Sequence, residues 1–221
     1  MEVLFDDQFD GAGTLVGHSA DVGGTWGNHG SGSLKLALGG GQVYRADGYD
    51  ADPASATASP ALYIGGQYEF EIEIDVLVRS SSDLWQSSWA WLNSADGGPS
   101  INLFLSRNGF VRMQMGPTSN HTISEAVKSE TETYTIKMAG AVGDDYAGVY
   151  VNNTYVGNYL LYAPMGNDVS VLLNIGDTRY GSADGYPSII RYNRITLRGD
   201  PYVPPPPDAF WTEVVRAEEI P

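Results

Sequence analysis

Apolar and polar residues alternate along most of this chain, and the alternation is clearest between residues 67 and 78. Apolar residues from Tyr68 to Val78 occupy every second position, and acidic residues from Glu69 to Asp75 lie between them. Because a period of two places alternate side chains on opposite faces, this segment is predicted to be a half-buried β-strand. The same pattern predicts further strands at residues 1–10, 33–38, 42–45, 85–92, 101–106, 110–115, 131–139, 149–151, 154–157, 169–175 and 188–198.

Turn-forming residues separate these segments and predict antiparallel hairpins. Gly143-Asp144-Asp145 and Asn152-Asn153 divide residues 134–159 into three strands, and Asn108-Gly109 joins two others. Asparagine tolerates a positive φ, so an Asn-Asn pair can close a two-residue turn. Two stretches rich in Ala, Ser, Asp, Gly and Pro, 47–60 and 176–187, are expected to be loops.

The length and composition favour one all-β domain followed by a different kind of segment. A chain of 221 residues with 27 glycines and 11% aromatic residues suits a β-sandwich with many turns. After Gly199 the sequence turns rich in proline, which lacks the N–H donor that a sheet interior needs. We therefore expect a domain over residues 1–199 and an extended arm over residues 200–221.

The net charge of −15 narrows the classes of partner. Such a charge repels nucleic-acid phosphates and anionic membranes, so we expect neither nucleic-acid binding nor membrane insertion. No basic and apolar leader of the signal-peptide type is visible at the N-terminus, and the chain has no cysteine. Neutral glycans and other proteins are the expected partners.

The segment FDDQFDGAGTLVGHSADVGGTW at residues 5–26 resembles the N-terminal part of concanavalin A-like or laminin-G-like jelly rolls in bacteriophage virion proteins. The motif of that family falls here on Leu15, His18, Asp21, Gly23 and Trp26. AGVYVNNTYVG at 147–157 resembles a hairpin of the same superfamily, and SIIRYNRITL at 188–197 resembles its closing strand, which returns beside the N-terminal one. The resemblance implies an all-β jelly-roll sandwich of two antiparallel sheets.

Aromatic residues supply the candidates for a glycan site. Flat aromatic rings stack on the C–H surfaces of sugars and need no formal charge to do so. We expect Trp85, Tyr180 and Tyr186 to be exposed and to contact a glycan. Trp89 and Trp91 share one face of their strand, and we expect that face to pack in the core; an exposed binding face is the alternative.

An enzymatic interpretation rests on Glu71, Glu73 and Asp75. They resemble the strand motif of jelly-roll β-glucanases, in which carboxylates two residues apart serve as nucleophile, helper and general acid. The order here is Glu-Glu-Asp where that motif has Glu-Asp-Glu, and a solvated acidic strand face is the favoured explanation of the pattern. We therefore expect no enzyme activity and no catalytic residue, with a glycan hydrolase as the alternative.

No cofactor or metal ion is expected. Asp144, Asp145, Asp177 and Asp184 lie in expected loops, where acids that form turns are commoner than calcium ligands. The histidines are scattered, and His18 is expected to hydrogen-bond within the N-terminal segment.

The C-terminal arm has the composition of a docking segment. A proline-rich spacer of polyproline type is followed by aromatic and β-branched residues, which are typical interface anchors. The expected docking residues are Tyr202, Phe210, Trp211, Val214 and Val215. The alternative is that the arm folds back over an edge strand of its own sandwich.

These observations lead to one functional hypothesis. The chain is expected to be a non-enzymatic structural protein on the surface of a phage virion, an adhesin or glycan-binding module of the tail tip or fibre. Its expected partners are other virion proteins, a host surface glycan and further copies of itself. A capsid decoration protein and a free lectin are the alternatives.

Overall fold

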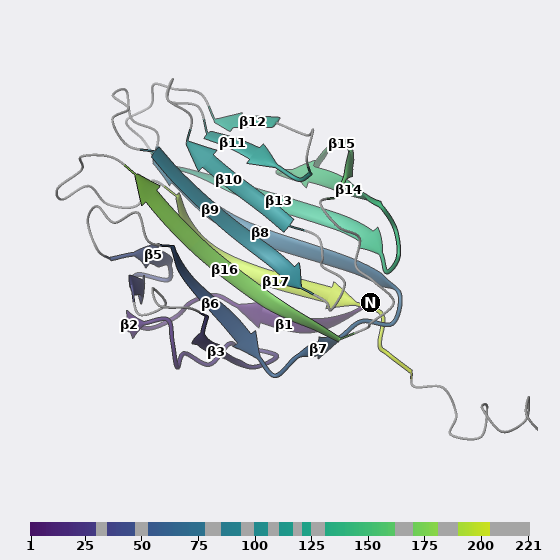
Figure 1. Cartoon of the computed structure of the whole chain (residues 1–221), viewed down its shortest axis with the longest axis horizontal. Helices are drawn as coiled ribbons and strands as arrows, with labels where there is room; N and C mark the ends of the chain where they lie inside the picture. Colours follow the sequence, from purple (N-terminus) through teal and green to yellow (C-terminus); the bar gives the residue numbers. More distant parts are fainter. Residues whose placement is uncertain are drawn as a thin grey trace, which may run out of the picture.

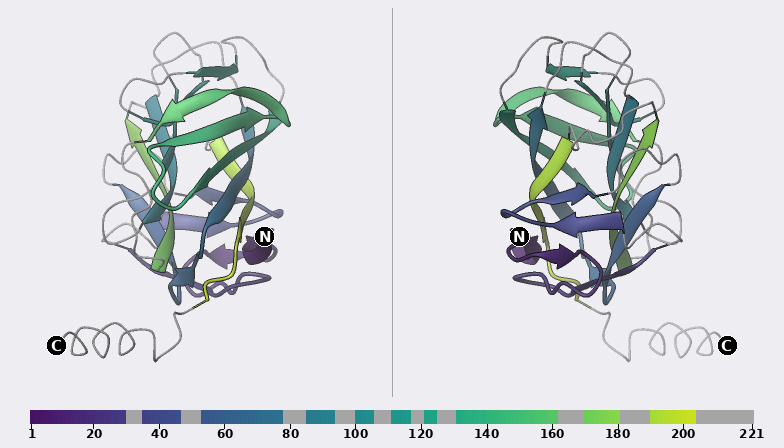
Figure 2. Two further views of the ribbon diagram at one scale, coloured as in Figure 1. Left: turned by 90° about the vertical axis from the view of Figure 1, so that its right-hand side faces the viewer. Right: turned by 90° about the vertical axis from the view of Figure 1, so that its left-hand side faces the viewer.

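The computed structural model of the chain describes residues 1–29, 35–46, 53–77, 85–93, 100–105, 111–116, 121–124, 131–161, 170–180 and 190–203. These residues form two antiparallel sheets, packed face to face as two layers (Figures 1 and 2). The predicted two-sheet sandwich is therefore confirmed. Within the described part of the chain, no helix is long and apolar enough to cross a membrane.

The first sheet has nine strands and contains both ends of the domain. Eight of them follow the order β15-β14-β13-β8-β17-β5-β4-β2, and β1 pairs with β17 beside this path. The strands are β1 (Glu2–Asp7), β2 (Gly13–Thr14), β4 (Leu36–Leu38), β5 (Val43–Arg45), β8 (Gln67–Leu77), β13 (Thr131–Ala141), β14 (Tyr146–Val151), β15 (Thr154–Leu160) and β17 (Ile190–Gly199). The pairing of β1 with β17 confirms that the closing strand returns beside the N-terminal one.

The second sheet has eight strands and lies in front of the first in Figure 1. Its order is β12-β11-β10-β9-β16-β6-β3, and the short strand β7 pairs with β16. The strands are β3 (Thr25–Asn28), β6 (Ala54–Ser59), β7 (Leu62–Tyr63), β9 (Trp85–Asn93), β10 (Ser100–Leu105), β11 (Val111–Gln114), β12 (His121–Ser124) and β16 (Ser170–Tyr180).

The core lies between the two sheets and follows the alternation in the sequence. On β8, every second residue from Tyr68 to Val76 is buried, while the acidic residues between them reach the outer face. Both expected asparagine turn residues have a positive φ, 48° at Asn152 and 62° at Asn153, and they join β14 to β15. These two predictions are confirmed.

The N-terminal motif is held together by one buried carboxylate. Asp7 accepts hydrogen bonds from Trp26 Nε1 at 2.6 Å, from the backbone N–H of Phe9 at 2.7 Å and from His18 Nε2 at 3.1 Å. Trp26 and Phe9 are themselves buried in the core. The motif residues thus fix the fold at the start of the chain, and the expected role of His18 is confirmed.

Gly23 completes this arrangement. It has a φ of 96°, and a Cβ atom there would lie 2.3 Å from the backbone oxygen of Leu4, so only glycine fits against β1. Asp21 accepts a hydrogen bond from the backbone N–H of Gln8 at 3.1 Å. The contacts of His18, Asp21, Gly23 and Trp26 in this segment are structural.

Two loop predictions are wrong in part. Residues 54–59, expected in a loop, form β6, whose residues Ala54, Ala56 and Ala58 are buried between the sheets. Residues 176–180 extend β16 instead of starting a loop. The buried residues described in these segments are alanines, a serine, a glycine and an aspartate. The alternation of large apolar residues that predicts a strand is therefore missing from both.

Candidate binding face

The outer face of the eight-stranded sheet carries a pair of tryptophans. On β9 the side chains of Gln86, Ser88 and Ala90 are fully buried towards the core, whereas Trp89 and Trp91 are half-buried on the opposite face. Their ring centroids are 5.8 Å apart and the ring planes differ by 30°. The expectation that these two tryptophans pack in the core is therefore wrong.

The reason is a buried polar cluster beneath the tryptophans. Gln86 Nε2 and Ser88 Oγ donate to Asp177 Oδ2 at 2.6 and 2.8 Å, and Arg45 donates to the Asp177 carbonyl at 3.2 Å. Burial and the charge of Asp177 raise the pKa of Tyr192 well above its usual value. Since this cluster takes the inward positions of β9, it leaves the outward positions to the tryptophans.

Trp89 lies directly over the backbone of the neighbouring strand. Gly176 on β16 is its register partner, and a Cβ atom on Gly176 would lie 2.2 Å from the indole ring. The ring can occupy this place only because residue 176 is glycine. On its other side Trp89 pairs with Asn102 of β10, which in turn pairs with Gln114 of β11. The ring thus has glycine on one side and the amide of Asn102 on the other, with the amide of Gln114 one strand farther out.

Trp91 has a similar surrounding of amide and hydroxyl groups. Its Nε1 lies 3.4 Å from Asn102 Oδ1, and its register partners are Asn174 and Ser100. Asn174 is almost fully buried and its Oδ1 accepts a hydrogen bond from Thr57, but its Nδ2 has no hydrogen-bond partner within the described structure. An unpaired buried donor beside an aromatic ring is a place where a ligand hydroxyl can bind.

The backbones of two predicted glycan-binding residues lie side by side at one end of this sheet. Trp85 begins β9 and Tyr180 ends β16, and the two residues are register partners. Tyr180 was expected in a loop, and the structure places its backbone on a strand instead. For both residues the description covers the backbone alone, and Tyr186 lies outside the described residues.

Comparison with solved structures identifies the fold of this chain. No protein-family model matches the sequence, and no curated protein matches it. Among solved structures, the chain is similar to Bacillus licheniformis β-glucanase, with a TM-score of 0.54 and 10% identity over 90% of this chain and 99% of that one. It is similar to the carbohydrate recognition domain of Emp46p, with a TM-score of 0.52 and 11% identity over 80% and 88%.

A third similar structure is the CBM2 module of the evolved Dit protein of Lactobacillus casei BL23 phage J-1. The TM-score is 0.52, with 9% identity over 89% of this chain and 94% of that one. The chain has the concanavalin A-like jelly-roll fold. Since both hydrolases and lectins share it, the fold alone does not select between them.

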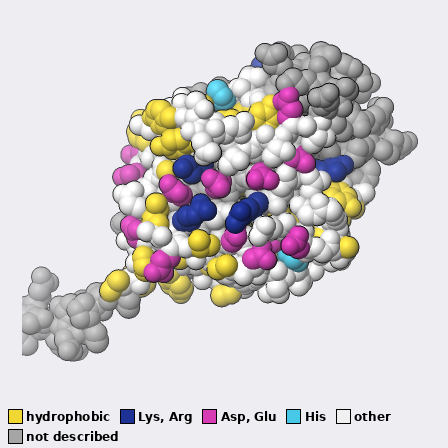
Figure 3. Space-filling view, turned by 180° about the vertical axis from the view of Figure 1, so that it is seen from behind, with side chains coloured by type: hydrophobic (Ala, Val, Ile, Leu, Met, Phe, Trp, Pro, Cys, Tyr) yellow, Lys and Arg dark blue, Asp and Glu magenta, His cyan; other side chains and the backbone are white. Residues whose placement is uncertain are grey.

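In this jelly roll, the three carboxylates of the enzymatic interpretation lie on the outer face of the other sheet, where Figure 3 shows acidic and basic side chains interspersed. Asp75 accepts hydrogen bonds from Gln42 at 2.5 Å and from Asn193 and Thr133 at 2.7 Å each. The register partners of Glu73 are Thr135 and Arg194, and Glu71 pairs with Lys137 and Thr196. Acidic and basic groups therefore alternate across this face.

The residues considered as metal ligands do not come together. Within the described ranges, no three His, Cys, Asp or Glu side chains gather as a metal site requires. Asp177 belongs to the buried cluster under β9, and Asp144 and Asp145 lie in the β13–β14 turn on the other sheet. Asp184 lies outside the described residues.

The chain leaves the sandwich beside its own N-terminus. The backbone N–H and C=O of Asp200 bond to Gln67 and Gly65, and its carboxylate lies 3.6 Å from the N-terminal nitrogen. Tyr202 stacks on Tyr63 with ring centroids 6.1 Å apart. Of the predicted docking residues, Tyr202 is partly exposed at this point, while Phe210, Trp211, Val214 and Val215 lie outside the described residues.

Proposed function

We propose that this protein is a non-enzymatic carbohydrate-binding protein of a bacteriophage particle, and that it binds glycan on the outer face of its eight-stranded sheet. The observation that carries this proposal is the half-buried Trp89–Trp91 pair on that face. Two rings with centroids 5.8 Å apart give two adjacent platforms for sugar C–H surfaces. The amides of Asn102 and Asn174 beside them supply donors and acceptors for sugar hydroxyls.

The same neighbourhood favours binding over hydrolysis. Most glycosidases use a pair of carboxyl groups on either side of the scissile bond. The register partners of the two tryptophans are glycine, serine and asparagine residues. Glu71, Glu73 and Asp75 lie on the outer face of the opposite sheet, so a glycan on the tryptophans cannot reach them.

The virion part of the proposal has separate support. The N-terminal segment resembles that of phage virion proteins, and the CBM2 module of a phage Dit protein has a similar fold. The chain leaves the sandwich at an exposed end, where Val203 is 79% exposed and the proline-rich arm follows. An arm that starts there can extend to a partner without crossing the tryptophan face.

Glycan binding is tested with three versions of the full chain on a glycan array, followed by calorimetry on the best ligand. We expect the Trp91→Ala variant to lose at least tenfold in affinity, which corresponds to about 1.4 kcal/mol. The Tyr63→Ala variant, which removes an exposed aromatic residue far along the same sheet, should bind as the natural chain does. Equal binding by all three versions would show that the tryptophan face is not the site.

Virion attachment is tested with particles that lack the protein. The full chain should bind them, and a truncation after Val203 should not. The truncation point lies after Val203 because Asp200 and Tyr202 belong to the folded domain. If neither version binds particles but both bind glycan, the protein is a free lectin and the virion assignment is wrong.

A further inference from the structure

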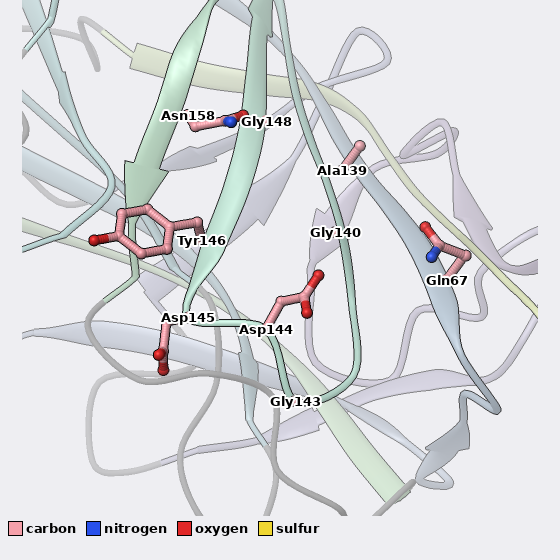
Figure 4. Close-up of a pocket in the computed structure, with 9 residues that line it drawn as sticks. All are labelled: Gln67, Ala139, Gly140, Gly143, Asp144, Asp145, Tyr146, Gly148 and Asn158. Atoms are coloured by element: carbon pink, nitrogen blue, oxygen red, sulfur yellow. The ribbon is translucent and has the colours of Figure 1, made fainter.

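A hollow opens on the outer face of the nine-stranded sheet, on the opposite side of the molecule from the tryptophans (Figure 4). It has a volume of about 530 Å³ and lies beside the turn between β13 and β14. The lining residues are Gln67, Ala139, Gly140, Gly143, Asp144, Asp145, Tyr146, Gly148 and Asn158. Small residues form its floor and polar side chains surround it.

Gly148 in the floor has no structural need to be glycine. It lies in the interior of β14, where glycine weakens a strand by roughly 0.5–1 kcal/mol relative to alanine. Its φ is not positive, and a Cβ atom would meet Asn158, Tyr150 and Tyr155 at ordinary contact distances of 3.5–3.7 Å. Neither strain nor crowding requires the glycine. A strand glycine of this kind marks a bulge or the close approach of a ligand. The register shift in this hairpin falls between Val149 and Tyr150, whereas Gly148 stays in register with Ala139 and Asn158.

Gly140 in the floor lies over a buried hydroxyl group. A Cβ atom on Gly140 would lie 2.8 Å from the hydroxyl oxygen of Tyr68. That hydroxyl is buried and has no hydrogen-bond partner within the described residues. Burial and the nearby charge of Asp144 raise the pKa of Tyr68, so the group remains a neutral donor. Tyr68 and Gly140 are register partners and Tyr68 faces the core, so this hydroxyl lies on the inner side of the sheet. Gly140, unlike Gly148, is therefore explained by the packing of Tyr68 beneath it.

The walls combine aromatic rings with planar polar groups. Tyr146 in the wall is 56% exposed. Tyr155 lies behind the wall, is 54% exposed and donates a hydrogen bond to Asn158 Oδ1 at 3.0 Å. Figure 4 shows the Asn158 side chain reaching towards Gly148, with the Asp144 carboxylate rising from the turn. Carboxylate and amide groups bind sugar hydroxyls in pairs, and tyrosine rings cover sugar C–H surfaces.

We propose that this hollow is a second carbohydrate-binding site, which takes a single neutral hexose or N-acetylhexosamine unit over Gly148. Asn158, Asp144 and Gln67 bind its hydroxyl groups, and Tyr146 borders it. The carboxylates of Asp144 and Asp145 repel acidic sugars, so uronic and sialic acids are excluded. Because the two sites lie on opposite sheets, this site does not depend on the function proposed above.

The test uses the full chain with Trp89→Ala and Trp91→Ala, which disables the tryptophan face. Glucose, galactose, N-acetylglucosamine, N-acetylgalactosamine and glucuronate are titrated at millimolar concentration while backbone amide shifts are followed by NMR. We expect at least one neutral sugar to shift the amide signals of Gly148 and Asn158, and glucuronate to leave them unchanged. If no neutral sugar shifts them, the proposal is overturned.

Two further variants separate binding from folding. Gly148→Val fills the hollow and should weaken sugar binding at least tenfold, while the unfolding midpoint stays equal or rises because valine favours strands. Gly148→Ala, whose Cβ fits without any shift of its neighbours, should weaken binding less and also keep the fold. Gly27→Ala, at a strand glycine of the other sheet, is the control and should leave binding unchanged. Undiminished binding by Gly148→Val, or equal binding of glucuronate, would contradict the assignment.

Discussion

Replacing Gly176 by alanine tests whether Trp89 is placed by the backbone beneath it. A Cβ atom at position 176 would lie 2.2 Å from two atoms of the Trp89 ring and 2.6 Å from its Nε1. Real Cβ atoms do not approach other atoms so closely, and the clash is with the ring itself. The ring is half-buried on an open face, so it can move outwards, away from Trp91 and the sheet.

The size of the effect follows from three contributions. Overpacking costs about 1–3 kcal/mol when neighbours cannot move, and the outward swing of Trp89 relieves part of it. The swing also loses the Trp89–Trp91 contact, about 0.5–1.5 kcal/mol. Alanine in a strand regains about 0.5–1 kcal/mol relative to glycine. We expect Gly176→Ala to lower the free energy of unfolding by about 1–2 kcal/mol in total.

A double-mutant cycle in urea, followed by far-ultraviolet circular dichroism, isolates the contact. In the Trp89→Ala background the same alanine has no ring to meet, so Gly176→Ala should be neutral or stabilising there. The coupling energy should be about 1–3 kcal/mol. Gly27→Ala, where a Cβ would meet Thr57 at an ordinary 3.5 Å, reports the backbone contribution alone. If Gly176→Ala costs the same with and without Trp89, the ring does not lie over Gly176, and its role as a fixed platform is refuted.

Three further predictions concern the scaffold. Asp7→Asn should lower the free energy of unfolding in urea by about 2–3 kcal/mol, because three donors converge on this buried carboxylate. The control Asp21→Asn, at an exposed carboxylate that accepts one hydrogen bond, should lower it by less than about 1 kcal/mol. The hydrogen bond from Arg194 holds the pKa of Asp6 below its usual value. The stability that the Asp6 carboxylate contributes is therefore complete above the unfolded pKa of about 3.9 and is lost as the pH falls through the folded pKa. Arg194→Met should reduce the dependence of the urea midpoint on acid pH. Asn153→Ala, at a φ of 62°, should cost about 1 kcal/mol in thermal unfolding, and Asn153→Gly should restore the stability.

Strands with strict alternation could be predicted from sequence, because each inward position is apolar and the pattern is local. β8 is the best case, since its buried face from Tyr68 to Val76 needs no knowledge of the rest of the chain. The turn at Asn152-Asn153 is equally local, because positive φ at two successive residues is a property of those residues. The closing of β17 on β1 could be predicted only by resemblance, since the two strands are far apart in sequence.

The tryptophan face could not be predicted because its cause lies in a distant segment. The inward positions of β9 hold Gln86 and Ser88, and their partner Asp177 is about ninety residues away along the chain. A local pattern therefore assigns the tryptophans to the core, where large apolar residues belong on average. Gly176 could have indicated the position of Trp89, because a strand glycine opposite an aromatic residue indicates close packing. That inference requires the register between β16 and β9, which the sequence alone does not provide.

The two outer faces of the sandwich handle charge in different ways, and this limits what each can bind. On the nine-stranded sheet, acids of β8 are paired with basic or hydroxyl groups of β13 and β17, so the charges there are largely compensated by neighbours. On the eight-stranded sheet, the register partners of Trp89 and Trp91 are uncharged, and Arg112 lies farther out on β11. The surface formed by the tryptophans and these register partners loses little solvation when a neutral polyhydroxy ligand covers it, whereas a face of paired charges must give up water at each charge. The tryptophan face is thus the surface on which binding of an uncharged glycan costs least.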